Sequence, residues 1–153
     1  MPPPPESGVE RKLEPPPLPV VARPKPTGPR TARRQPWLDE ARETLKRLEV
    51  VTRLPGWDDE GAEAFPASRW ESARSFVAMV VLFDVPRPMI SPCGDGYIHF
   101  EWRDGERTVL AELGDAKHVV SASSPSERTE ETFSSLGDLL LRTTRLLDQR
   151  RGK

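Results

Sequence analysis

Few residues of this chain have types and spacing that suit chemistry. His99 and Glu101 are two residues apart in a segment typical of a strand, so both side chains would lie on the same face of the sheet. Asp58 or Asp59 could complete a divalent-cation site with them. Catalytic zinc usually needs three protein ligands, and His118 is the only other histidine in the sequence. We therefore expect no metal or other cofactor, and we keep a small metal-dependent hydrolase centred on His99 as an alternative.

Nucleophilic catalysis has little support in the sequence. Cys93, the only cysteine, lies in a Pro-Cys-Gly turn without a neighbouring basic residue that would activate its thiol. No Gly-x-Ser-x-Gly elbow occurs, and no glycine-rich loop carries the lysine of a phosphate site. We therefore predict that the protein is not an enzyme and has no catalytic residue. A single cysteine also excludes an internal disulfide framework and is typical of a reducing compartment, so we expect a cytoplasmic protein.

Residues 54–66 place a tryptophan, three consecutive acids and two glycines between two helical patterns. The simplest interpretation is a connection between helices, in which Trp57 packs inward and the acids cap backbone amides. Loops on rigid scaffolds also carry function, and an aromatic side chain ringed by charges is typical of an interface. The candidate partner-binding residues belong to this loop and to one strand face: Trp57, Asp58, Asp59, Glu60, Tyr97, His99 and Glu101.

Composition divides the chain into an arm, residues 1–36, and a single α+β domain, residues 37–153. The arm holds twelve of the 18 prolines, seven basic residues against three acidic ones, and no Trp, Tyr, Phe or Ile. We predict that it is disordered or forms polyproline II, because it has too little apolar surface to fold. It could act as a spacer, as a ligand for a partner's groove, or as a contact for nucleic acid. No apolar run is long enough for a membrane span, so we expect no membrane association.

Three helices are predicted in the domain. Apolar residues recur at helical steps from residue 38 to residue 54, where Pro55-Gly56 ends the pattern. A second helix should start near Ser68, which forms a capping-box pattern with Glu71, and stop before Pro86. A last helix is expected over residues 136–147, with Ser135 as its N-cap.

The middle of the domain predicts an antiparallel meander. Residues 97–103 alternate strictly, and Asp104-Gly105 is typical of a two-residue hairpin loop, which would set Trp102 opposite Arg107. Residues 117–122 indicate a further strand, and residues 123–131 a polar connection. The expected apolar face consists of Ile98, Phe100, Val109 and Ala111. The predicted fold is α+β: two N-terminal helices, a three- to four-stranded antiparallel meander and a C-terminal helix, preceded by the disordered Pro-rich arm.

Two stretches of the domain carry a resemblance. They are Gly56-Trp57-Asp58-Asp59-Glu60-Gly61-Ala62, and the segment from Pro88 to Pro92 followed by Gly96-Tyr97-Ile98-His99-Phe100-Glu101-Trp102. Over residues 37 to 122 the chain resembles an uncharacterised group of small bacterial proteins with a Trp-Asp-x-x-Gly-Ala loop and an Asp-Gly…Glu-Trp hairpin. The resemblance implies a bacterial, cytoplasmic α+β domain and no catalytic residue. The loop of that group usually reads Trp-Asp-Gly-x-Gly-Ala, so Asp59 stands where the group usually has glycine.

These features together favour a non-enzymatic protein-binding module. The domain is acidic, with net charge −5, the arm is basic, and a charged loop joins two helices. We therefore expect a cytoplasmic inhibitor, antitoxin or immunity-type partner of another protein. The alternatives are a nucleic-acid-associated regulator that uses residues 1–36, and the hydrolase centred on His99.

Overall fold

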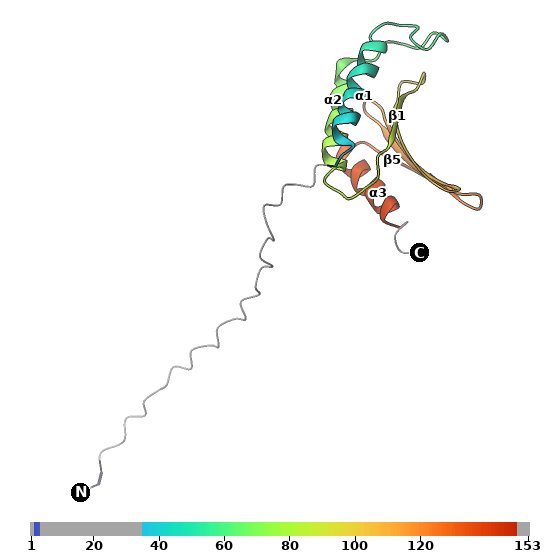
Figure 1. The fold of residues 1–153 in the computed structure, drawn as a ribbon. Coiled ribbons are helices and arrows are strands. Elements are labelled where there is room, and N and C mark those ends of the chain that lie inside the picture. Colours follow the sequence, from blue (N-terminus) through green and yellow to red (C-terminus); the bar gives the residue numbers. More distant parts are fainter. Residues whose placement is uncertain (1, 4–34, 150–153) are drawn as a thin grey trace. The chain divides into compact units, whose positions relative to one another are not determined.

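The computed structural model describes residues 2–3 and 35–149. The predicted disorder of the arm concerns residues that lie almost entirely outside this part of the chain. In order, the elements are α1 (Leu38–Val51), α2 (Ala67–Val80), β1 (Met89–Pro92), β2 (Ile98–Asp104), β3 (Arg107–Leu113), β4 (His118–Ser123), β5 (Arg128–Phe133) and α3 (Leu136–Asp148) (Figure 1). The predicted α+β class and the order of helices around a meander are confirmed.

The strands form one antiparallel sheet in the order β1-β2-β3-β4-β5. The sheet has five strands, so the expectation of three to four is wrong, because β5 begins within the stretch predicted as a polar connection. This strand has the sequence Arg-Thr-Glu-Glu-Thr-Phe and therefore lacks an apolar alternation. It lies at the edge of the sheet, where charged side chains also prevent pairing with another chain.

The β2–β3 hairpin has a different register from the one predicted. Asp104 pairs with Arg107, so the two-residue loop is Gly105-Glu106 rather than Asp104-Gly105. Gly105 has φ +57° at the first loop position, which is the glycine position of a type II′ turn. Trp102 therefore lies opposite Val109 and not opposite Arg107. The observed partner of each β2 residue lies two residues further along β3 than the predicted one. Because this difference is an even number, the division of side chains between the two faces is as predicted.

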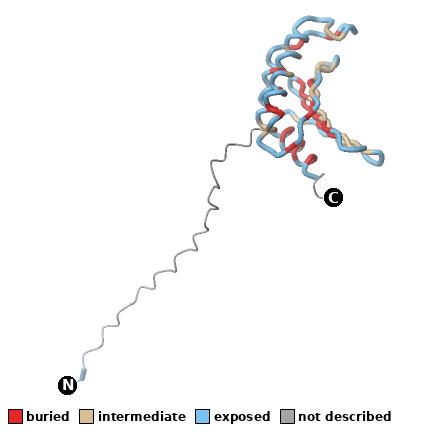
Figure 2. Tube along the Cα trace, viewed as in Figure 1, coloured by how far each residue is buried: buried red, intermediate tan, exposed pale blue. Residues whose placement is uncertain are grey.

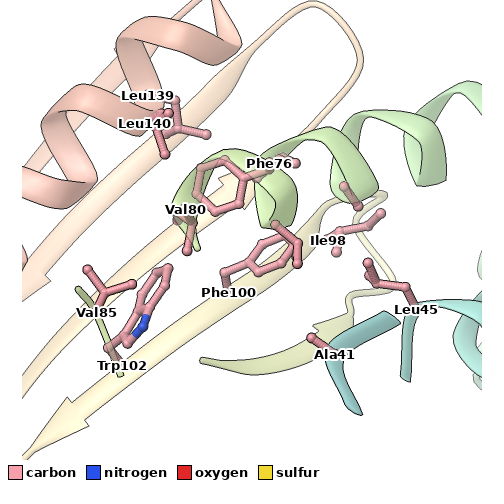
Figure 3. Packing of buried hydrophobic residues seen from close by; sticks show 14 of the residues in the cluster. Ala41, Leu45, Phe76, Val80, Val85, Ile98, Phe100, Trp102, Leu139 and Leu140 are labelled. Carbon is pink, nitrogen blue, oxygen red and sulfur yellow. The ribbon is translucent and has the colours of Figure 1, made fainter. Parts of the chain in front are cut away.

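The helices cover one face of the sheet and form the core with it (Figures 1 and 2). Phe76 of α2 packs on Phe100 of β2 with 4.8 Å between ring centroids, and Val80 and Leu139 extend this layer (Figure 3). All four of the predicted core-face residues are buried. The opposite face of the sheet has no covering helix among the described elements, and His99 and Glu101 lie on it.

The helix ends show how local sequence starts and stops each helix. Helix α2 begins one residue before Ser68, after the extended Pro66 (φ −67°, ψ 149°), and no side chain caps it. The predicted capping box is therefore wrong, because Pro66 itself sets the entry into the helix. The predicted cap of α3 is confirmed, since the Ser135 hydroxyl accepts a hydrogen bond from the Asp138 amide.

Among residues 35–149, no helix is both long and apolar enough to cross a membrane.

Candidate functional site

The α1–α2 loop, residues 52–66, closes on itself through backbone hydrogen bonds. The Gly56 amide donates to the Ala62 carbonyl at 2.7 Å, and the Asp59 amide donates to the Gly56 carbonyl at 3.1 Å. Such a tight path needs left-handed backbone, which Gly56 and Gly61 adopt with φ of +76° and +89°. Asp59 also has a positive φ, +61°, at the position where the resembling pattern has glycine.

Asp58 holds the interior of this loop. Its Oδ1 accepts hydrogen bonds from the amides of Ala62 (2.9 Å) and Glu60 (3.0 Å). The bond from Ala62 lowers the pKa of Asp58, desolvation opposes this effect, and the bond from Glu60 adds to it. Its Oδ2 lies against the β1–β2 turn, since a Cβ on Gly94 would come within 2.6 Å of it. Asp58 is therefore a structural carboxylate that ties the loop to the sheet.

Trp57 packs inward, as the sequence predicts. Its ring meets the buried Phe65 edge to face at 5.5 Å, and its indole N–H donates to the Glu63 carbonyl at 3.1 Å. The side chain is half-buried against the core. Trp57 thus anchors the underside of the loop, while Asp59 and Glu60 are exposed on its outer side.

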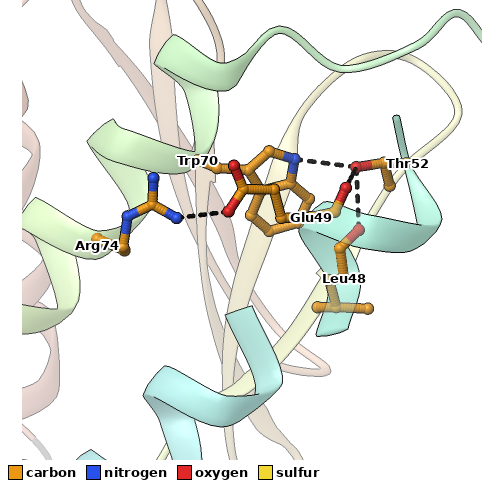
Figure 4. Close-up of polar contacts among 5 residues, drawn as sticks. All are labelled: Leu48, Glu49, Thr52, Trp70 and Arg74. Carbon is orange, nitrogen blue, oxygen red and sulfur yellow. Dashed lines mark hydrogen bonds and ion pairs between the residues drawn. The ribbon is translucent and has the colours of Figure 1, made fainter. Parts of the chain in front are cut away.

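A buried polar chain fastens both ends of the loop to the helices (Figure 4). The Trp70 indole N–H of α2 donates to the Thr52 hydroxyl at 2.9 Å, and this hydroxyl donates to the Leu48 carbonyl of α1 at 3.0 Å. The Thr52 carbonyl accepts the Phe65 amide at 2.9 Å. Thr52 and Trp70 are both fully buried, so these hydrogen bonds have no competition from water.

Arg69 connects α2 with two turns of the sheet, a role that the sequence does not reveal. Its guanidinium donates to the Gly96 carbonyl at 2.6 Å and to the Asp115 carboxylate at 2.5 Å. It also lies 5.0 Å from the centroid of the Phe65 ring. Beside it is a polar hollow of about 450 Å³ between the α1–α2 loop and these turns. Small-molecule sites are mostly apolar, so the hollow is a poor candidate for one.

The second group of predicted residues lies on β2 and at Tyr97, the residue just before this strand. The His99 Nε2 is 3.1 Å from a carboxylate oxygen of Glu112, and Glu101 pairs with Arg103. Tyr97 packs against the β3–β4 turn, since a Cβ on Gly114 would come within 2.8 Å of its ring. Glu101 therefore has a partner other than His99, and Asp58 directs Oδ1 to the loop amides. The structure does not assemble the cation site that the sequence suggested from these residues.

A different set of ligand types gathers around His99. The ligand atoms of Cys93, Asp95 and His99 all lie within 4.8 Å of one another. The Asp95 amide lowers the pKa of the Cys93 thiol, but burial and the Asp95 carboxylate outweigh it, so the pKa is raised. The thiol is therefore no activated nucleophile. The pattern Cys-x-Asp-x-x-x-His across a turn was the available sequence signal for this cluster.

Comparisons of the chain with protein-family models, with curated proteins and with solved structures give no significant match. Two features stand out from the structural background: the fixed α1–α2 loop with an acidic outer side, and the Cys93, Asp95 and His99 cluster.

Proposed function

We propose that this protein binds another protein, in the manner of an inhibitor, antitoxin or immunity protein, and docks through the α1–α2 loop. The observation that carries the proposal is a fixed loop flanked by exposed apolar side chains. Val50, Val51 and Leu54, at the end of α1 and just after it, are 57%, 54% and 72% exposed. Exposed apolar groups beside a polar rim are typical of an interaction surface.

The rigidity of the loop favours binding because less conformational entropy is lost when a partner docks. Asp58, Trp57 and the Gly56–Ala62 bond fix its path without using the outer side chains. A partner would therefore meet a preformed surface. Trp57 supports this surface from below, and the direct contacts come from residues that point outward, such as Leu54 and Glu60.

Charge indicates the chemistry of the partner. The loop contains Asp58, Asp59, Glu60 and Glu63 against one basic residue, Arg53, and residues 37–153 carry net charge −5. Opposite charges across an interface speed association and fix orientation. The expected partner is therefore a protein with an apolar patch surrounded by lysine and arginine side chains.

Two leucines allow a matched test of this surface. Leu54 follows α1 and Leu82 follows α2, with exposures of 72% and 79%. The two helices run antiparallel, so the leucines lie at opposite ends of the helix pair (Figure 1). A photo-crosslinking amino acid is placed at either position in the full-length protein and irradiated in living cells. A defined protein adduct from position 54 that is absent from position 82 supports docking through the loop. Adducts from position 82 alone, or equal yields from both, contradict it.

A further inference from the structure

A cluster of metal-ligating side chains lies where β1 turns into β2. Cys93 and Asp95 belong to the turn and His99 to the start of β2, and their ligand atoms lie within 4.8 Å of one another. Cys93 and His99 are half-buried, whereas Asp95 is exposed. The cluster is thus shielded on one side and accessible to an ion on the other.

The turn that carries these residues is fixed by bonds that leave the ligand atoms available. The Cys93 amide donates to the Tyr97 carbonyl at 2.8 Å, and the Gly96 amide donates to the Cys93 carbonyl at 2.9 Å. Asp95 Oδ1 accepts the Tyr97 amide at 3.1 Å. The Asp95 carboxylate also accepts a hydrogen bond from the Cys93 thiol, whose proton an ion bound to sulfur would displace. Arg69 holds the turn from α2 through the Gly96 carbonyl. A preorganised turn lowers the cost of ordering the ligands around an ion.

The ring of His99 lies beside a carboxylate that can orient it. Its Nε2 is buried and makes no hydrogen bond of good geometry, although the Glu112 carboxylate is only 3.1 Å away. Metal-binding histidines commonly direct their second ring nitrogen to a carboxylate, which orients the ring and raises its basicity. Glu112 is placed for this role, and Nδ1 of His99 is then left for the ion.

We propose that Cys93, Asp95 and His99 bind one Zn²⁺ ion, with Glu112 positioning His99 and one coordination position open to water. A thiolate, an imidazole and a carboxylate are all zinc ligands, whereas Mg²⁺ and Ca²⁺ prefer oxygen alone. Tetrahedral zinc, with bonds of about 2.0 to 2.3 Å, separates its ligand atoms by about 3.3 to 3.8 Å. The present cluster needs a contraction of about 1 Å to reach that geometry, which rotation of the Cys93 and Asp95 side chains can provide. The site does not depend on docking through the α1–α2 loop.

The test uses the full-length protein, stripped of metal and kept reduced with a phosphine. Titration with ZnCl₂ in a calorimeter is expected to show one ion per chain. Titration with Co²⁺ is expected to give a thiolate-to-metal charge-transfer band. Because Cys93 is the only cysteine, this band identifies the site without any substitution. Zinc alone is also expected to raise the melting temperature, since it binds the folded chain.

Single substitutions then separate this ligand set from the one that the sequence suggested. Cys93→Ser, Asp95→Asn and His99→Gln are each expected to weaken zinc binding at least tenfold, and Glu112→Gln about tenfold. Glu101→Gln is the matched control, because Glu101 lies on the same face of β2 and pairs with Arg103. It is expected to leave zinc affinity unchanged, and circular dichroism checks that every variant is folded.

Four results would overturn the assignment. One is cobalt binding without a charge-transfer band, which would exclude the thiolate. Another is one ion per two chains, which would place the metal between copies of the protein. A third is a loss of affinity in Glu101→Gln as large as in His99→Gln. A full-length protein that binds no zinc in the calorimeter would refute the proposal directly.

Discussion

Thr52→Val tests the buried polar chain that joins the α1–α2 loop to both helices. Valine has nearly the shape of threonine but no hydroxyl, so the substitution removes the acceptor of the Trp70 indole N–H. Thr52 and Trp70 are fully buried, and water cannot replace the lost partner. A buried donor left without an acceptor costs about 1–3 kcal/mol, so we expect the free energy of unfolding to fall by about 2 kcal/mol.

Thr143→Val is the matched control within the same chain. Thr143 is also 0% exposed and in a helix, and its hydroxyl donates to the Leu139 carbonyl at 2.7 Å. No donor depends on that hydroxyl in the described structure, and the Leu139 carbonyl keeps its helical hydrogen bond. The same substitution is therefore expected to cost only about 0.5 kcal/mol.

Urea unfolding followed by tryptophan fluorescence measures the difference, and calorimetry provides a second readout. For a domain of this size about 1 kcal/mol shifts the melting temperature by about 4 °C, so Thr52→Val should melt about 8 °C lower. A stability loss in Thr52→Val no larger than in Thr143→Val would refute the role assigned to the Trp70–Thr52 hydrogen bond.

Three further predictions concern single residues. Because Asp59 has φ +61°, Asp59→Gly should raise the free energy of unfolding by about 0.5–1 kcal/mol, and Asp59→Ala should lower it. Urea unfolding measures both changes, and the opposite order of stability would exclude a left-handed backbone at this residue. Burial lowers the pKa of His118, so the unfolded chain binds its proton more readily and stability should fall as pH decreases below about 6.5. Melting curves from pH 7.5 to 5.5 should show a falling melting temperature in the wild type and a smaller fall in His118→Leu. An equal fall of the melting temperature with pH in both proteins would contradict the role assigned to His118. Gly94→Ala should destabilise the protein, because the new Cβ would lie 2.6 Å from the Asp58 carboxylate. Gly137→Ala in α3 has room for its Cβ and should stabilise by about 0.5 kcal/mol. Equal melting temperatures of these two variants would contradict the contact between the α1–α2 loop and the β1–β2 turn.

The sequence predicted the elements that have strong periodicity. The apolar steps of α1, the cap of α3 and the alternation along β2 each follow from local physics, and the structure confirms them. Strand β5 was missed because an edge strand buries little and needs no apolar alternation. Its pairing with β4 depends on contacts across the sheet, which residues 128–133 alone do not encode.

The errors in detail have equally physical causes. An Asp-Gly pair suits a type I′ loop, but glycine at the first loop position is equally good in a type II′ turn, and the latter is observed. The division of β2 and β3 residues between faces was correct because a shift by an even number of residues preserves it. Local sequence thus defined the faces, and the turn geometry defined the register.

The candidate sites show the limit of linear spacing. The inward packing of Trp57 and the capping role of Asp58 were predictable, because a helix–helix connection needs an anchor and capped amides. The clustering of Cys93 and Asp95 with His99 was not expected, since it depends on the turn that folds residue 93 back over β2. Arg69 was missed because its partners are carbonyl and carboxylate groups of distant turns.

The most direct measurement of docking through the α1–α2 loop is the affinity of the protein for its crosslinked partner, once that partner is purified. Calorimetry would compare the wild type with Leu54→Ser, Glu60→Lys and the control Leu82→Ser. We expect a dissociation constant at least tenfold higher for both loop variants, an unchanged value for Leu82→Ser, and weaker binding of the wild type at high salt. Unchanged affinity in both folded loop variants, or an equal loss in Leu82→Ser, would contradict binding through this loop.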